Sequence, residues 1–314
     1  MQRKRLQNRI SESRWLLAFV APVAISVWIL VSFFDHSAIP PMICLLFSTY
    51  LMLELNNANA LIRIYSRMVS CTFLVLTTMA TFQFTSIRSA IVVLCSVGFY
   101  TCAFRCYQDT RSQGWIFYAF LCLGLSSIVW IQTLFFVPLL WILIATNLLA
   151  MSPKSFVSSL FGLIFPYFFF VGYCLATNNI AELANHFTEI ANFGSLLDYQ
   201  NLSLNQILSF ALVLLCAAIG TIHCILQKRS DSIRTRLLYG FFITVNTAAI
   251  IFICLQPQHF DTLLSIIVVS TSPLIGHFFA LTHSKLSDFT FKSLVFITLA
   301  LLLFNLWTLL SNFL

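Results

Sequence analysis

The feature that most constrains this chain is a series of long apolar runs separated by short polar connections. The runs are about 16 to 22 residues long, close to the ~20 residues that one helical crossing of a bilayer needs. They are apolar on every side, whereas the strands of a membrane barrel would show segments of about ten residues that alternate in polarity. Only helices and closed barrels satisfy their backbone polar groups in lipid. We therefore expect an all-α fold, a polytopic helical membrane protein.

Composition agrees with this fold class. Sixty per cent of the residues are hydrophobic and 9% are charged, whereas a soluble domain carries about 25% charged residues. No stretch resembles the surface of a soluble domain. We expect residues 1–14 to form a basic cytoplasmic N-terminus, and residues 15–314 to form a single helical membrane domain.

Eleven spans are expected. The stretch Trp115–Met151 is divided in two, because as one helix it would be ~55 Å long, too long for one crossing. A tight turn near Trp130–Gln132 is preferred there. The predicted runs are 15–34, 40–55, 68–83, 89–105, 115–130, 132–150, 156–176, 206–226, 237–255, 262–281 and 293–312.

Charge distribution predicts the orientation. With the N-terminus in the cytoplasm, all of the 17 Lys and Arg residues except Arg88 fall on the inside, as the positive-inside rule requires. The loop at 177–205 and the C-terminus are then extracytoplasmic, and the predicted location is the bacterial inner (cytoplasmic) membrane. The net charge of +7 reflects this topology, so the expected partner is the lipid bilayer and no nucleic acid.

The ten cysteines lie in or at the ends of apolar runs. Cys102 and Cys106 are four residues apart, but no His or carboxylate completes a metal set around them. We interpret all ten as small packing residues with no disulfide framework and predict no metal ligands among them.

The long polar interruption at 176–205 begins with a helical pattern. Apolar residues recur at helical spacing over Asn179–Phe193, with acidic residues and a histidine on the other side. This predicts a helix lying on the outer membrane surface. Its predicted membrane face consists of Leu183, Phe187 and Ile190, and its predicted water face of Glu182, His186 and Glu189.

Three outer loops each offer a histidine beside a carboxylate. These groups could act as general acid or base, or hold a divalent cation as a cofactor. The alternative is that they are solvated interfacial residues, and the sequence does not show whether they converge. The candidate catalytic residues are Asp35, His36, Glu182, His186, His259 and Asp261.

The candidate substrate-binding residues Glu54, Arg63 and Arg105 lie toward the inner side. Glu54 is taken as the only ionisable residue within a span away from its edges, which makes it a functional candidate. Alternatively, its helix ends at Leu55 and Glu54 lies in the headgroup zone, paired with Arg63 or Arg67. Arg105 belongs to a polar turn that either binds phosphate or is simply solvated.

Prolines interrupt four of the runs, and Ser270-Thr271-Ser272-Pro273 is the most polar of these sites. Broken helices of this kind line the substrate sites of transporters. An ordinary proline kink is the alternative.

Several stretches resemble an uncharacterised family of bacterial multipass inner-membrane proteins. They are YLMLELNNANALIRIYSRM (50–68), FRCYQDTRSQGWIFYAFLCLGLSS (104–127), SLFGLIFPYFFF (159–170), LQPQHFD (255–261) and STSPLIGHFFALTHSK (270–285). The likeness covers nearly the whole chain and implies no particular chemistry.

More distantly, the order of parts resembles the C-type, polyprenol-phosphate-dependent glycosyltransferases. The likeness rests on the cytoplasmic N-terminus, the span number, the acid in the first outer loop, and helices with Gly124, Gly162 and Pro166. It implies that Asp35 is the catalytic acid and that a polyprenyl-phosphate-linked sugar is the donor.

Three functions remain open. The first is an enzyme of the outer leaflet that transfers a sugar from a lipid-phosphate donor. The second is a small-solute transporter that works around Glu54 and the tenth span. The third is a non-catalytic scaffold subunit of an envelope assembly.

Overall fold

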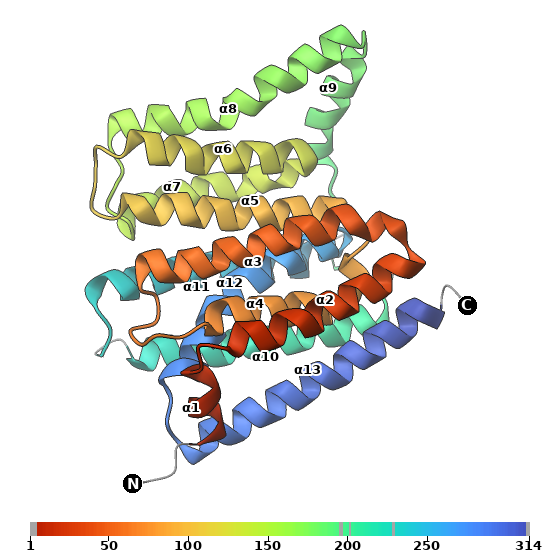
Figure 1. Cartoon of the computed structure of the whole chain (residues 1–314). Coiled ribbons are helices and arrows are strands. Elements are labelled where there is room, and N and C mark those ends of the chain that lie inside the picture. Colours follow the sequence, from red (N-terminus) through yellow and green to blue (C-terminus); the bar gives the residue numbers. More distant parts are fainter. Residues whose placement is uncertain (1–4, 195–196, 201, 228–229, 312–314) are drawn as a thin grey trace.

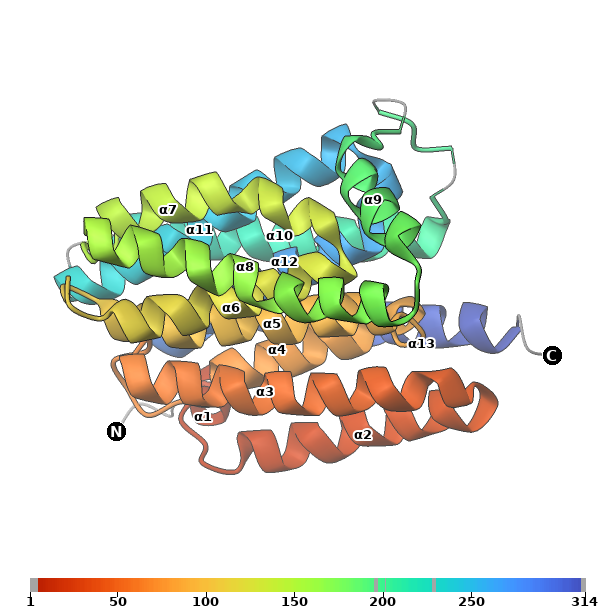
Figure 2. The ribbon, with the colours of Figure 1, turned by 90° about the horizontal axis from the view of Figure 1, so that it is seen from above.

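The chain folds into a bundle of helices that run back and forth between two ends (Figures 1 and 2). The computed structural model describes residues 5–194, 197–200, 202–227 and 230–311, which hold thirteen α-helices and no strand. We call the end that carries the N-terminus the inner end and the opposite end the outer end, following the predicted topology. Outside the described residues lie the predicted C-terminus at 312–314 and four of the counted basic residues, Arg3, Lys4, Lys228 and Arg229.

Helices occupy all eleven predicted runs. Eight of them, within the described residues, are long and apolar enough to cross a membrane. These are α2 (Leu16–Phe34), α3 (Ile39–Asn59), α5 (Ile87–Ala103), α8 (Pro153–Ala176), α10 (Leu204–Leu226), α11 (Ile233–Leu255), α12 (Phe260–Leu281) and α13 (Lys285–Ser311). The other runs hold the shorter apolar helices α4 (Met68–Met79), α6 (Gln113–Val129) and α7 (Val137–Thr146). Two small helices, α1 (Leu6–Ser11) and α9 (Ile180–Thr188), complete the set.

The shortest of these helices are shorter than their apolar runs. Helix α4 has 12 residues, about 18 Å of helix, and a 3-10 turn, η2 (Thr81–Gln83), follows it. Eleven residues of α4 are buried and only Val75 is exposed. Because protein encloses this helix, its length need not match the thickness of the bilayer. The run predicted at 132–150 is likewise divided into a 3-10 helix, η4 (Ile131–Phe136), and α7. The predicted turn near Trp130–Gln132 is present, because Trp130 is extended between α6 and η4.

Helix α12 forms the centre of the bundle. It is buried along its length except at Asp261 and Phe278, and it packs against α4, α5, α10 and α11. By contrast, α2 and α13 lie on the flanks, and only 17% of the residues in the most apolar stretch of each helix are buried. Helix α12 continues through Pro273, so the helix break expected for a transporter is not formed.

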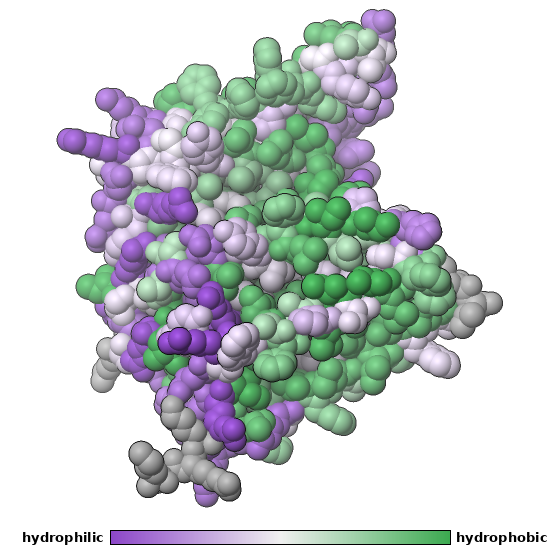
Figure 3. All heavy atoms as spheres, viewed as in Figure 1, coloured by the Kyte–Doolittle hydropathy of each residue, from purple (hydrophilic) through white to green (hydrophobic). Residues whose placement is uncertain are grey.

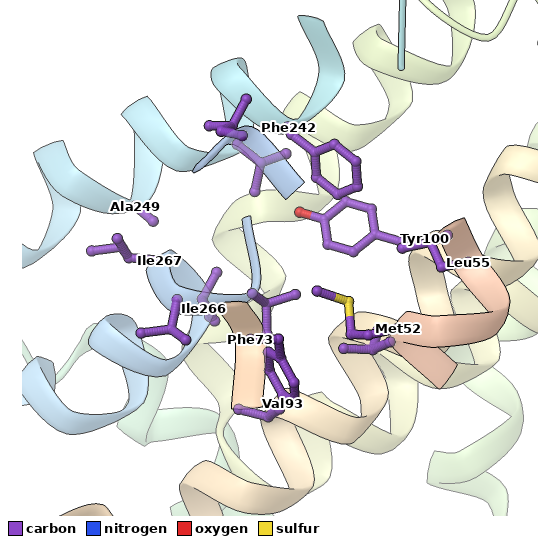
Figure 4. Close-up of a cluster of buried hydrophobic side chains, with 14 of the residues drawn as sticks. Met52, Leu55, Phe73, Val93, Tyr100, Phe242, Ala249, Ile266 and Ile267 are labelled. Carbon is purple, nitrogen blue, oxygen red and sulfur yellow. The ribbon is translucent and has the colours of Figure 1, made fainter. Parts of the chain in front are cut away.

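Aromatic and branched side chains fill the core around α12 (Figure 4). Tyr100 on α5 lies 4.8 Å from Phe242 on α11 between ring centroids, and Met52 and Phe73 are fully buried beside them. Burying a side chain of this size from water stabilises a fold by about 1.5–3 kcal/mol. Within a bilayer this drive is absent between helices, so close packing and hydrogen bonds carry more of the stability.

Glycines allow α6 and α8 to approach closely. A Cβ added to Gly162 would lie 2.5 Å from the backbone oxygen of Phe117, and one added to Gly124 would lie 2.7 Å from that of Leu163. Small residues at such contacts let two backbones meet, as in other membrane helix pairs.

Polar residues gather at the two ends of the bundle. Figure 3 shows hydrophilic side chains concentrated on the inner end and a hydrophobic middle on the same face. All ten cysteines are free, as predicted.

Candidate functional site

A polar cavity opens at the outer end of the bundle. Its volume is about 350 Å³. It lies where α5, α10 and α12 begin and where α6 passes into η4. The cavity is lined by Ser86, Arg88, Ser89, Trp130, Leu202, Gln206, Pro257, Gln258, His259, Phe260, Asp261 and Thr262.

The surroundings of the cavity favour an anion. Three helices begin there, and each has the positive end of its dipole at this end. Ser86 caps α5 by accepting a hydrogen bond from the backbone N–H of Ser89. Arg88 in the first turn of α5 is exposed and adds a full positive charge. Asp261 is the one acidic residue in the lining.

Hydrogen bonds hold Asp261 in place at the cavity wall. Its Oδ1 accepts a hydrogen bond of 2.9 Å from Nε2 of Gln206 on α10. The Gln206 Oε1 in turn accepts from the backbone N–H and the hydroxyl of Ser203 at the start of that helix. The amide of Gln206 is therefore fixed at both ends. On the other side, Gln83 Nε2 donates to the backbone oxygen of Asp261 at 3.0 Å.

His259 lies beside Asp261 in the short 3-10 helix η7 (Pro257–His259), which precedes α12. Its Nδ1 is 3.5 Å from the indole Nε1 of Trp130, and the two rings meet edge to face. Its Nε2 is 3.2 Å from the side-chain nitrogen of Gln258. The cavity therefore combines a carboxylate, an imidazole, a guanidinium and several hydroxyls, which can bind an anionic group and move a proton.

Asp35 and His36 do not line this cavity. They lie in the turn between α2 and α3, where Asp35 accepts a hydrogen bond of 2.9 Å from the backbone N–H of Ser37. The hydrogen bonds from Ser37 hold the pKa of the Asp35 carboxyl below its usual range. His36 Nδ1 is 3.0 Å from the backbone oxygen of Ser32. Both side chains therefore form hydrogen bonds within the connection between α2 and α3.

The predicted surface helix is present as α9 with a 3-10 extension, η5 (Glu189–Ala191). Glu182 is exposed and accepts a hydrogen bond of 3.0 Å from Asn179, the residue just before this helix. Neither Glu182 nor His186 lines the cavity. The outer loop is nevertheless close to it, because Gln258 Nε2 donates to the backbone oxygen of Asn192 at 3.0 Å.

The prediction that His186 faces water is wrong. Its ring packs against Phe170 and Tyr167 of α8, with ring centroids 5.3 and 6.0 Å away. Burial lowers the pKa of His186, although Glu189 opposes the shift. The helical spacing placed His186 correctly beside Glu182 and Glu189, but aromatic rings in the second half of α8 cover that part of the polar face.

Two of the three inner candidates, Glu54 and Arg105, lie together, and Arg63 lies apart from them. Glu54 Oε1 lies 4.0 Å from Nη2 of Arg105, with both side chains about 40% exposed (42% and 39%). Arg105 also lies over the ring of Trp115 at 4.5 Å. Glu54 is therefore partly exposed, and its basic partner is Arg105 and not Arg63 or Arg67. Arg63 instead points to the connection between α10 and α11, where its Nη1 is 3.5 Å from the backbone oxygen of Ser230.

Two features were missed by sequence reasoning. Arg88 was counted only as the exception to the positive-inside pattern, although it lines the cavity at the outer end. The statement that Glu54 is the only ionisable residue within a span is wrong, because His277 is fully buried in α12 and His223 is buried in α10.

Within the described ranges, no three or more His, Cys, Asp or Glu residues lie where they could hold a metal ion together. The acids of the outer loop and Asp35 thus do not gather around a cation. Comparison with protein families, curated proteins and solved structures finds no match to the chain.

Proposed function

We propose that the chain is an inner-membrane enzyme with eleven crossings that transfers a sugar from a polyprenyl-phosphate donor at the outer leaflet. The observation that carries this proposal is the outer cavity, because it places Arg88, His259 and Asp261 around one open space. The likeness to C-type glycosyltransferases names the same face of the membrane and the same donor class. The catalytic carboxylate is reassigned from Asp35 to Asp261, which acts as the general base.

The orientation is part of the proposal and has its own test. Ala184 on α9 and Ser230 in the α10–α11 connection are both exposed and lie at opposite ends. In right-side-out membranes, a maleimide that does not cross the bilayer should label Ala184→Cys above the wild-type background and leave Ser230→Cys unlabelled. The reverse pattern would refute the orientation.

The residues of the cavity suit the transfer step. The bond between the sugar and its phosphate breaks, and the phosphate leaves with the polyprenol. Arg88 and the N-terminus of α5 would stabilise this departing negative charge. The acceptor hydroxyl forms the new bond to the sugar, and its proton passes to the carboxylate of Asp261, which Gln206 orients.

The test uses the full chain in nanodiscs with a short-chain polyprenyl-phosphate hexose labelled in the sugar. Arg88→Gln should weaken binding at least tenfold, because one charge-assisted contact to phosphate is lost. Asp261→Asn should retain binding and lose transfer to an added mixture of envelope glycans. Arg105→Gln at the inner end is the matched control and should change neither. Binding that is unaffected by Arg88→Gln would refute the proposed site.

A transporter is the second candidate, and the polar residues of α12 favour it. Ser265 bonds to Gln83, and Thr271 lies 3.2 Å from the amide nitrogen of Asn246, both in the buried interior. Polar groups therefore continue inward from the cavity along the central helix. The measurement is the uptake of a labelled solute into proteoliposomes. The transporter would be supported if Thr271→Val abolished this uptake and the wild type transferred no sugar.

A further inference from the structure

The inner end of the bundle holds a second group of ionisable residues. His277 lies about one turn before the end of α12, His223 lies near the end of α10, and Asp231 lies in the α10–α11 connection. The side chains of His277 and Asp231 are 1% and 6% exposed, and Nε2 of the ring is 3.3 Å from Oδ2 of the carboxylate. The rings of His223 and His277 lie 5.2 Å apart between centroids. We propose that Asp231, His277 and His223 form a buried site that binds a single proton.

The charges of the group explain why it takes one proton. With Asp231 ionised and both rings neutral, the group carries one negative charge. The first proton neutralises that charge within the protein interior. A second proton would place two imidazolium rings 5.2 Å apart with only one carboxylate between them, and like charges at such a distance disfavour each other strongly. The proton belongs to the three residues together, as in other coupled groups.

The two ring nitrogens of His277 face different groups. Its Nδ1 is 3.9 Å from Sγ of Cys224, and a thiol is both a weak donor and a weak acceptor, so this contact fits either tautomer. The direction of the Nε2–Oδ2 contact departs from that of a hydrogen bond, so Nε2 of His277, like Nε2 of His223, has no hydrogen-bond partner in the described part of the chain.

Unpaired nitrogens set this group apart from a structural ion pair. Buried polar atoms in a finished core are nearly always hydrogen-bonded. A histidine and a carboxylate that served packing alone could be replaced by apolar residues at no loss. Ionisable groups buried within membrane helices are functional candidates by default. Burial raises the pKa of the Asp231 carboxyl, even though Arg63, His223 and Arg236 oppose the shift, so the carboxylate readily shares the proton.

The surrounding charges tune the site. Those that neighbouring elements bring closest are Arg63 before α4, Cys224 on α10, and Arg236 and Tyr239 on α11. Arg63 and Arg236 are exposed, and their positive charges disfavour the binding of a proton at the site. The Tyr239 ring packs 4.5 Å from His277, and its hydroxyl donates to the backbone oxygen of Leu61. Other charges nearby are engaged elsewhere: Arg67 over Tyr65, Arg234 with Asn59, and Lys292 with Asp288.

The proton comes from the inner solution. Ser230 and Ser232, on either side of Asp231, are exposed at the inner end. Since Asp231 belongs to a connection and His277 to the central helix, binding the proton changes the attraction between them. The site thus lets inner pH alter how the α10–α11 connection is held on α12 (Figure 1). This inference is independent of the outer cavity, which lies at the other end of the molecule.

The test is a titration of the six histidines by ¹⁵N NMR, with the ¹⁵N-histidine-labelled full chain in phosphatidylcholine nanodiscs between pH 3.5 and 8. His223→Asn and His277→Asn assign the two ring signals. In the wild type, uptake by the two rings should sum to one proton. Asp231→Asn should lower the proton affinity of His277 at least tenfold, because the compensating carboxylate is lost. Asp288→Asn, which removes another inner-end acid, is the matched control and should leave the His277 titration unchanged.

A second variant has the opposite expected sign and keeps the proposal falsifiable if Asp231→Asn does not fold. Arg63→Gln removes an exposed cation that opposes the proton, so it should raise the proton affinity of His277 severalfold. The proposal is overturned if both rings take up a proton independently of each other, or if neither ring titrates in the wild type and Arg63→Gln leaves this unchanged.

Discussion

The close contact between α6 and α8 makes Gly162→Ala a sharp test of how this bundle is held together. The new Cβ would lie 2.5 Å from the backbone oxygen of Phe117 and 3.0 Å from Cβ of Phe120. Ordinary contact at such a position is 3.4–4 Å. A backbone oxygen cannot rotate away as a side chain can, so the two helices must separate by on the order of 1 Å in a close-packed interior.

Overpacking of this kind costs about 1–3 kcal/mol. It is opposed by the better helix propensity of alanine, about 1 kcal/mol per glycine replaced. The contact with Phe117 is below any distance that a real Cβ shows, so we expect the packing cost to prevail and a net loss of about 1–2 kcal/mol. The assay is reversible unfolding in mixed micelles with increasing sodium dodecyl sulfate, followed by tryptophan fluorescence.

Helix α8 supplies its own control. Gly172 is exposed, and a Cβ added there meets no atom within 4 Å. Gly172→Ala should therefore leave stability unchanged or raise it by up to about 1 kcal/mol. If Gly162→Ala is as stable as Gly172→Ala, then the α6–α8 contact is not as close as described and the packing argument fails.

Three further outcomes follow from the described contacts. Glu54→Gln should change the free energy of unfolding by less than about 1 kcal/mol, since half-exposed ion pairs contribute little; a larger loss in the same unfolding assay would show that Glu54 is desolvated. Burial lowers the pKa of His186, so the unfolded ring binds a proton more readily, and the docking of α9 should weaken as pH falls through the unfolded value of about 6.5. Limited proteolysis of the outer loop at pH 5.5 and 7.5 should show faster cleavage at the lower pH, and His186→Phe should abolish the difference. Asn305 on α13 is fully buried and donates to Met79 and Ser209, so Asn305→Leu should destabilise by about 1–3 kcal/mol, and an unfolding midpoint equal to that of the wild type would contradict its role in holding α13.

The helices were predictable from sequence because a helix that crosses a bilayer needs a continuous apolar run. Such a run can be recognised in the sequence without knowing which helices pack against it. Helix α4 shows what apolar length does not predict. Its apolar run was predicted as one helix over 68–83, but protein surrounds the helix, which is therefore free to end early at Met79.

The candidate site was predictable only where its residues are close in sequence. His259 and Asp261 reach the same cavity because they lie on one turn of chain. Arg88 and Gln206 come from other helices, and no local pattern reports which helices are neighbours. The pair of Asp231 and His277 was missed for the same reason, since a loop acid and a lone histidine acquire meaning only when they touch.

The complete enclosure of α12 constrains how the protein is assembled. Its serines, threonines and His277 make it a poor segment to leave in contact with lipid, where each unpaired polar group is costly. The helices that surround it, α4, α5, α10 and α11, precede it in the chain and enter the membrane earlier. They must therefore remain apart until α12 arrives and then close around it. Biogenesis of this protein should pass through an intermediate that is open at its centre, which a membrane chaperone would be suited to occupy.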